Sequence, residues 1–202
     1  MVSLLPQQLT IREFIDHYGD NDCYELIDGE LIEMEPTGSH EQVAAFIGRK
    51  LNVAIDQHNE DFLIPYRCLV KVLGTKTAFR TDVLVLDQRQ LVHEPLWQQE
   101  PVITLETSIK LVVEVVSTNW QNDYARKTED YALFGIPEYW IVDYLGLGGR
   151  DYIGNPKQPT LSICTLDGDQ YRKQIFRHEE RIISSIFPTL QLTANQIFAA
   201  GR

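Results

Sequence analysis

LVVEVVSTNW, residues 111–120, decides how this sequence folds, because five of its first six residues are aliphatic and four of those are valine. Such a run is typical of a β-strand buried in a protein interior. It also holds one carboxylate, Glu114. Leaving a buried charge unpaired costs about 3–5 kcal/mol, so this acid must pair with a cation, become neutral or bind a metal ion. Considered alone, Glu114 favours the structural ion pair.

A second carboxylate, Asp82, stands at the head of another aliphatic strand within FRTDVLVLD, residues 79–87. Because side chains alternate along a strand, Asp82 shares its face with Leu84 and Leu86. Glu114 is likewise the one acid on an apolar face. If the two strands are neighbours, the carboxylates converge at the edge of a sheet. Carboxylate oxygens suit a hard cation such as Mg²⁺ or Mn²⁺, and no His/Cys cluster competes for a zinc ion.

The segment NDYARKTEDYALFG, residues 122–135, is expected to form a helix that ends at Gly135. Lys127 lies between Tyr124 and Tyr131 at helical spacing, so its side chain starts from the face that covers the sheet.

Two interpretations of Lys127 are open. In the first, its side chain extends along the surface and pairs with Asp123 or Asp130, which lie four residues before it and three after it. In the second, it stands beside two converging acids, where it orients a water molecule and offsets charge on a phosphate.

Capping boxes and turn residues delimit the other elements. Two strands are expected on either side of Asp28-Gly29, and two more, TLSICTL and QYRKQIF, on either side of Asp167-Gly168. Helices are expected at 11–18 after Thr10, from a capping box that begins at Ser39, and at 193–199; in the second of these, one face carries Val43, Ile47, Leu51, Ala54 and Ile55.

Further strands are expected within the extended runs 62–73 and 77–87 and at 138–144. Residues 91–108 contain two prolines and are expected to form an irregular surface excursion. This order predicts one α/β domain, residues 1–202, with a mixed central sheet flanked by helices and β-hairpins added at both ends.

The formal net charge is −11, which argues against a general nucleic-acid coat protein because phosphate binding needs a cationic surface. One stretch differs: residues 62–81 contain no acid but carry Arg67, Lys71, Lys76 and Arg80. These residues either lie on ordinary solvated strand faces or belong to a cationic hairpin beside an acidic metal-binding region.

The cysteines and the apolar runs indicate a compartment. The three cysteines form no CxxC pair, which disfavours a disulfide framework. No apolar run is long enough to span a bilayer, and the first residues lack the features of a signal peptide. We therefore expect a cytoplasmic protein.

Several segments resemble the Uma2 family, formerly a domain of unknown function and common in cyanobacteria. They are YELIDGELIEM, PTGSH, RTDVLVLD, LVVEVVS and YALFGIPEYWIVDY, and the resemblance extends from about Ile11 to Ala199. It implies the PD-(D/E)XK superfamily, with a restriction-endonuclease-like fold. It also implies metal-dependent hydrolysis of nucleic-acid phosphodiesters, with DNA as the expected substrate and Mg²⁺ or Mn²⁺ as the cofactor.

The resemblance assigns roles to particular residues. Asp82 matches the acid of the "PD" element, with Thr81 in place of the proline, and Glu114 matches the acid of the "(D/E)XK" element. The lysine two positions further on is absent, since Val116 stands there. Members of this fold can take the lysine from the next helix, and Lys127 is the matching candidate.

Other positions receive secondary or substrate-binding roles from the resemblance. Glu25, Glu30 and His40 match recurrent family positions, although the two acids would equally suit an exposed hairpin face and His40 a helix start. The basic residues of the stretch 62–81 would follow the nucleic-acid backbone.

A different class of function also fits these features. Val116 and the net charge of −11 favour a catalytically inert module that keeps the fold and binds DNA or a protein. A glycosidase with two carboxylates is less well supported, because no aromatic platform lies near the acids in sequence. No nucleophile elbow or Cys/His signature indicates a serine or cysteine hydrolase. A homodimer is expected only by analogy with nucleases of this fold, which often cut two strands through the symmetry of a dimer.

Overall fold

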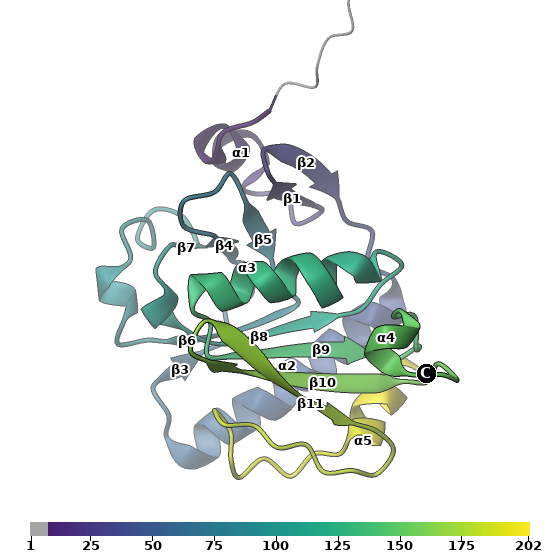
Figure 1. Cartoon of the computed structure of the whole chain (residues 1–202). Coiled ribbons are helices and arrows are strands. Elements are labelled where there is room, and N and C mark those ends of the chain that lie inside the picture. The colour runs from purple at the N-terminus through teal and green to yellow at the C-terminus, as the bar shows by residue number, and fades with distance from the viewer. Residues whose placement is uncertain (1–7) are drawn as a thin grey trace, which may run out of the picture.

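The chain folds around two mixed β-sheets, as seen in a computed structural model that describes residues 8–202 (Figure 1). In order across it, the central sheet contains β11 (Gln170–Phe176), β10 (Thr160–Asp167), β9 (Glu138–Asp143), β8 (Ile109–Val115), β6 (Val83–Asp87) and β3 (Phe62–Leu63). The N-terminal sheet contains β2 (Glu30–Glu33), β1 (Tyr24–Ile27), β5 (Ala78–Arg80), β4 (Leu69–Lys71) and β7 (Val102–Ile103). Only the pairs β8–β9 and β4–β7 are parallel; the other paired strands are antiparallel.

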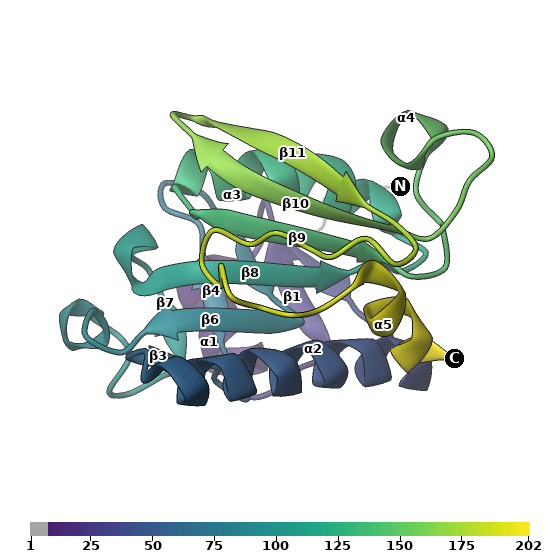
Figure 2. The ribbon, with the colours of Figure 1, turned by 90° about the horizontal axis from the view of Figure 1, so that it is seen from below.

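Helices pack against both sheets. They are α1 (Ile11–Tyr18), α2 (Gly38–His58), α3 (Lys127–Phe134), α4 (Arg150–Ile153) and α5 (Ala194–Phe198), with a π-helical turn at Asn122–Arg126 and 3₁₀ turns at Leu91–His93, Glu106–Ser108 and Ala199–Gly201. Figure 2 shows α2 and α5 on one face of the central sheet, while α3 lies on its other face. Helix α1 packs on the N-terminal sheet. Within residues 8–202, no helix combines the length and the apolar character that crossing a membrane requires.

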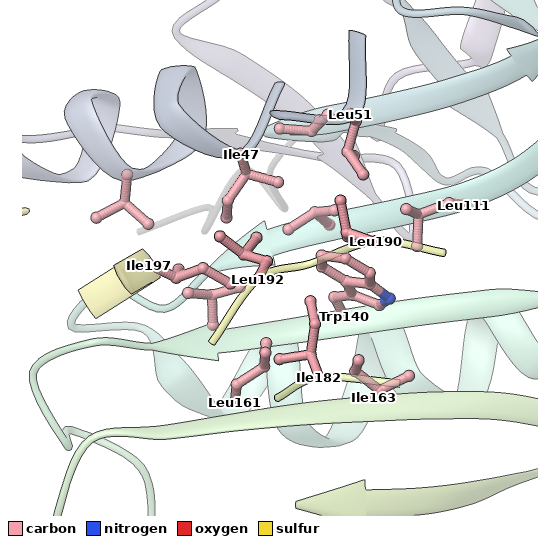
Figure 3. Packing of buried hydrophobic residues seen from close by; sticks show 14 of the residues in the cluster. Ile47, Leu51, Leu111, Trp140, Leu161, Ile163, Ile182, Leu190, Leu192 and Ile197 are labelled. Atoms are coloured by element: carbon pink, nitrogen blue, oxygen red, sulfur yellow. The ribbon is translucent and has the colours of Figure 1, made fainter. Parts of the chain in front are cut away.

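Alternation along β8 divides the hydrophobic core in two. Leu111, Val113 and Val115 belong to the cluster under α2 and α5, part of which Figure 3 shows with Ile47, Trp140 and Ile197. Val112 belongs to the second cluster, beneath α3, as does Val116 just beyond the strand. Glu114 falls between these two valines in the alternation, so its side chain lies on the α3 side, as the sequence predicts.

Most of the expected elements are present, but the start of α2 was wrongly placed. The helix begins at Gly38 rather than after Ser39, because the side chain of Thr37 accepts the hydrogen bond from the backbone N–H of His40. The helix therefore begins about half a turn early. Its expected apolar face, from Val43 to Ile55, is buried.

Each extended run between residues 62 and 87 is shared by the two sheets rather than forming one strand. Within the first, β3 pairs with β6 in the central sheet, whereas β4 joins the N-terminal sheet. Within the second, β5 pairs with β1 and β4, and β6 pairs with β8. The chain therefore crosses between sheets at Thr81 and Asp82, so Asp82 lies at a junction and not within a strand.

The segment 91–108 is only partly the surface excursion that its prolines suggest. Glu94 is buried and accepts hydrogen bonds from the backbone N–H groups of Thr104 and Leu105. Val102 and Ile103 form β7 and are buried. This carboxylate satisfies backbone donors that the short strand leaves unpaired, and it holds the excursion against the body of the protein.

Candidate active site

Four carboxylates from different elements line one cleft of about 1160 Å³ between the two sheets. Glu25 comes from β1 and Glu114 from β8, so each sheet contributes one acid. Asp82 comes from the crossing between β5 and β6, and Asp123 from the π-helical turn before α3. Glu25, Glu114 and Asp123 are buried, while Asp82 is half-buried.

Lys127 is the cation at the centre of this group. Its Nζ lies 3.0 Å from Oε2 of Glu114, 3.6 Å from Oε2 of Glu25 and 3.7 Å from Oδ1 of Asp123. Only 4% of the residue is exposed, so the ammonium does not extend into bulk solvent. The pairing with Asp123 considered from the sequence is present, but the nearest partner is Glu114.

A π-helical turn carries Asp123 and ends just before Lys127, and both side chains line the same cleft. Its wider loop ends where the N–H of Lys127 donates to the carbonyl of Asn122. The carbonyl of Asp123 accepts from the hydroxyls of Thr128 and Tyr139, at 2.9 Å each. Those two bonds satisfy a backbone acceptor near the widened turn, and turns of this kind are frequent at functional sites.

Glu114 is held at both oxygens. Tyr131 donates its hydroxyl to Oε1 at 2.7 Å, while Lys127 donates to Oε2. Burial raises the pKa of Glu114 well above its usual value; Lys127 opposes this shift, and the neighbouring acids reinforce it. Tyr131 and Lys127 thus fix the orientation of the carboxylate within the sheet.

Burial and the neighbouring charges together shift the pKa values of Asp123 and Lys127. Burial raises the pKa of Asp123 to about 7, against the opposing effect of Lys127. Burial alone would lower the pKa of Lys127, but Glu114, Glu25 and Asp123 together raise it well above its usual value. One ammonium shared among several carboxylates leaves the group able to take up further positive charge.

Asp82 and His40 bracket the Val115 peptide. The N–H of Val115 donates to Oδ2 of Asp82 at 2.6 Å, and its carbonyl lies 2.8 Å from Nε2 of His40. The same imidazole nitrogen is 3.4 Å from Oδ2 of Asp82. Burial opposes protonation of His40, but Asp82 and the carbonyl outweigh it and raise the pKa of His40 to about 9. The protonated ring therefore donates a hydrogen bond to the carbonyl of Val115 at the end of β8 and lies beside the carboxylate of Asp82.

The residues present fit a divalent cation. Oε2 of Glu25 is buried without a hydrogen-bond partner, and Asp82, Glu114 and Asp123 line the same cleft. Across residues 8–202, no group of three or more His, Cys, Asp or Glu side chains is arranged so that it could hold a metal ion. Mg²⁺ is often held by one or two carboxylates with water and substrate phosphates completing its shell, which suits an open pair of acids.

Val116, at the position where the superfamily motif has lysine, is part of the core. It is 1% exposed and belongs to the same apolar cluster as Tyr124 and Tyr131. A cation supplied by α3 therefore reaches Glu114, while the strand itself keeps an apolar side chain there.

Of two other residues considered from the sequence, Glu30 lies outside the cleft, whereas Arg80 lines it but has a structural place. Glu30 is exposed on β2 and does not line the cleft. Arg80 is buried and donates to the backbone carbonyls of Tyr24, Tyr18 and Gly19, which gives it a structural place rather than a free cationic surface.

The rest of the basic stretch is dispersed. Lys76 is exposed and donates to the side chain of Gln8, and Lys71 is half-buried in β4. Neither residue lines the cleft, whereas Arg67 does and pairs with Asp22 at 2.8 Å. The stretch 62–81 therefore does not form a continuous cationic strip along the site.

The chain is similar to one protein family in sequence and to a solved nuclease-like structure in fold. A model of the Uma2 family, described as "Putative restriction endonuclease", matches residues 11–195. A crystal structure from Anabaena variabilis ATCC 29413, described as that of "a putative nuclease belonging to DUF820", aligns with a TM-score of 0.71 at 15% identity and covers 96% of this chain and 99% of that one. At this identity the likeness shows the fold alone, and it confirms the expected α/β architecture. No curated protein matches the chain.

Proposed function

Because the chain belongs to the Uma2 family, we propose that it is an endonuclease that hydrolyses phosphodiester bonds of DNA with the help of Mg²⁺ or Mn²⁺. Family membership supports a nuclease, and the site supports the finer statement. The observation that carries it is the single buried ammonium of Lys127 among Glu25, Glu114 and Asp123. Acids that share one cation suit a metal ion, and a lysine beside them suits a phosphate.

Asp82 and Glu114 are the proposed metal ligands. They come from two segments that meet at the end of paired strands β6 and β8, where an ion is reachable from the cleft. A bound divalent ion would lower the pKa of a water molecule and offset negative charge on the scissile phosphate. Glu25, whose Oε2 has no hydrogen-bond partner, is the proposed additional acid, acting through water.

The chain's own residues prepare this site for the reaction. Lys127 would donate a hydrogen bond to the attacking water or to a non-bridging phosphate oxygen. It would thus supply the positive charge that the lysine of the "(D/E)XK" element normally supplies from the strand itself. Tyr131 holds Glu114 in one orientation. His40 supports Asp82 and the Val115 peptide. These contacts keep the proposed ligands rigid before substrate binds.

Cleavage of DNA tests the proposal directly. The wild-type chain is incubated with Mg²⁺ or Mn²⁺ and a mixture of plasmid, linear duplex and single-stranded DNA, beside Asp82→Asn, Glu114→Gln and Lys127→Ala. Each variant should lose at least about a hundredfold in rate, as expected for loss of a metal ligand or of a charge-stabilising group. Glu129→Gln, an exposed acid on the same helix as Lys127, is the matched control and should cut like wild type. Equal cleavage by all the chains would exclude this site, and no cleavage by wild type would favour the inert module.

A further inference from the structure

Tyr66 is an exposed aromatic residue beside the cleft. It is 96% exposed, yet it lines the same cleft as Glu114 and Lys127. It lies in the loop between β3 and β4, where the chain crosses from the central to the N-terminal sheet. The ring is therefore presented at the mouth of the proposed active site with both faces available.

The loop that carries Tyr66 is fixed on each side. Pro65 restricts the backbone before it. After it, Arg67 pairs through Nε with Asp22 at 2.8 Å and donates through Nη1 to the carbonyl of Asp20 at 3.3 Å. An aromatic ring on a restrained backbone loses little conformational freedom when a flat partner stacks on it.

Helix α2 forms another wall of the cleft, and small and polar side chains line part of this wall. Ala45, Gly48, Arg49 and Asn52 line it at helical spacing. Gly48 is inside the helix, where glycine is unfavourable, and a Cβ there would meet nothing within 4 Å. Gly48 therefore leaves open space beside the backbone of α2 on this wall of the cleft.

Arg49 is the available cation on that wall. Its guanidinium lies over the ring of Phe46, 5.5 Å from the centroid, and among residues 8–202 no ion pair includes it. Deeper in the cleft, Oε2 of Glu25 and Nδ1 of His40 are buried without a hydrogen-bond partner, and the nearest opposite charges lie 3.6 Å away on Lys127 and Glu41. An exposed aromatic ring and a guanidinium outside the ion pairs of residues 8–202 thus line one cleft.

The charge of the cleft decides which nucleic acid suits it. Nine of the lining residues are Asp or Glu and four are Lys or Arg, one of them the buried Lys127. A duplex binds chiefly through many phosphate contacts with cations, and this lining opposes them. An unpaired strand also needs cations for its phosphates, but it can add the stacking of a base on an aromatic side chain, which a duplex cannot offer.

We propose that Tyr66 and the Arg49 wall of α2 form a subsite for single-stranded DNA, in which a base stacks on Tyr66 and Arg49 contacts a phosphate. The proposal rests on the proposed nuclease function and narrows its substrate to unpaired strands, overhangs or bases turned out of a duplex. The strand would pass between the loop at Tyr66 and helix α2, with its backbone directed to Asp82 and Glu114.

Binding measurements test the subsite separately from catalysis. Fluorescence anisotropy follows the wild-type chain with a labelled 12-nucleotide oligo(dT), a 12-base-pair duplex and oligo(U), with Ca²⁺ in place of Mg²⁺ and gels to verify that the probes stay whole. Oligo(dT) should bind at least about tenfold more tightly than the duplex. Tyr66→Ala should weaken oligo(dT) binding about tenfold or more, the range that loss of one base–aromatic stack produces, while Tyr66→Phe should stay within about twofold of wild type.

Two further variants complete the design. Arg49→Ala should weaken binding and reduce its dependence on salt concentration, because one phosphate contact is lost. Leu133→Ala removes another exposed large hydrophobic residue outside the cleft, 70% exposed on α3, and should bind like wild type.

The outcomes separate this proposal from the nuclease function. Tighter binding of the duplex, binding unaffected by Tyr66→Ala, or a preference for oligo(U) would overturn the single-stranded DNA subsite. If wild type also cuts duplex DNA with Mn²⁺ in that case, the nuclease function stands without it. If no probe binds and no substrate is cut, both proposals fall.

Discussion

Nζ of Lys127 lies 3.0 Å from Oε2 of Glu114, across 13 residues of sequence and from a helix to a strand. The pair is buried together with Glu25 and Asp123, so its charge balance depends on more than two groups. The stability of the metal-free protein and its response to metal therefore report on the site independently of any substrate.

Removal of the central cation should destabilise the metal-free protein. Lys127→Met keeps a flexible side chain of similar length but leaves Glu25, Glu114 and Asp123 without their shared ammonium. Loss of one partner from a buried ion pair costs about 3–5 kcal/mol, and protonation of the acids limits that loss below neutral pH. Urea unfolding in EDTA at pH 8 measures the change. Lys50→Met, a lysine on α2 outside the cleft, should leave the free energy of unfolding nearly unchanged.

Asp123 should make the metal-free protein less stable as pH rises. Its pKa is raised to about 7 in the folded state, compared with about 3.9 for an unfolded aspartate. The folded state therefore binds the proton more tightly, and the stability that this contributes is fully present below pH ~4 and lost as pH rises to about 7. Relative to Asp123→Asn, the wild type should lose roughly 2–4 kcal/mol between pH 4 and pH 8.

Urea unfolding of both chains across this range, in EDTA, checks the Asp123 prediction. Only the difference between the chains matters, because other groups titrate in both. A difference that does not change with pH, or that grows in the opposite direction, would contradict it.

A divalent cation should stabilise the folded chain through Asp82 and Glu114. Binding to the folded state alone adds about 2.7 kcal/mol when the ion is present at 100 times its dissociation constant. Thermal unfolding with Mg²⁺ or Mn²⁺ should show an upward shift for wild type and for the exposed-acid control Glu129→Gln. The double variant Asp82→Asn/Glu114→Gln should show little shift. A shift of the same size in the double variant would locate the ion elsewhere.

Glu138 should be structural, although it lies within YALFGIPEYWIVDY, one of the segments that carry the family resemblance. It is fully buried and accepts hydrogen bonds from the indole N–H of Trp140 and from the Ser184 and Ser185 hydroxyls. These bonds fasten the C-terminal segment onto the central sheet. Glu138→Ala should cost at least about 3 kcal/mol, because several buried donors lose their acceptor. Guanidinium unfolding measures this, with the exposed Glu129→Ala as control; a loss below about 1 kcal/mol would contradict the assignment.

Local patterns were sufficient for most of the secondary structure. The Thr10–Glu13 capping box and Gly135 fix helix ends through nearby hydrogen bonds and a left-handed residue, which depend on adjacent sequence. The start of α2 was misplaced because the local pattern offers two suitable caps. Thr37 and Ser39 are both residue types that cap helices well, and only the folded chain selects between them.

The sequence by itself determined that Glu114 sits in a buried strand, that Lys127 faces the sheet from the following helix and that the chain is of the α/β class, because period-two and helical spacing set which side chains share a face. Only the tertiary structure decided that Glu25 joins the site and Glu30 does not, that Asp123 belongs to it and that Arg80 is used to hold backbone carbonyls. Those outcomes depend on how the two sheets and the helices pack against one another. Contacts between segments far apart in sequence leave no local signal, since burial and pairing partners are set by the whole fold.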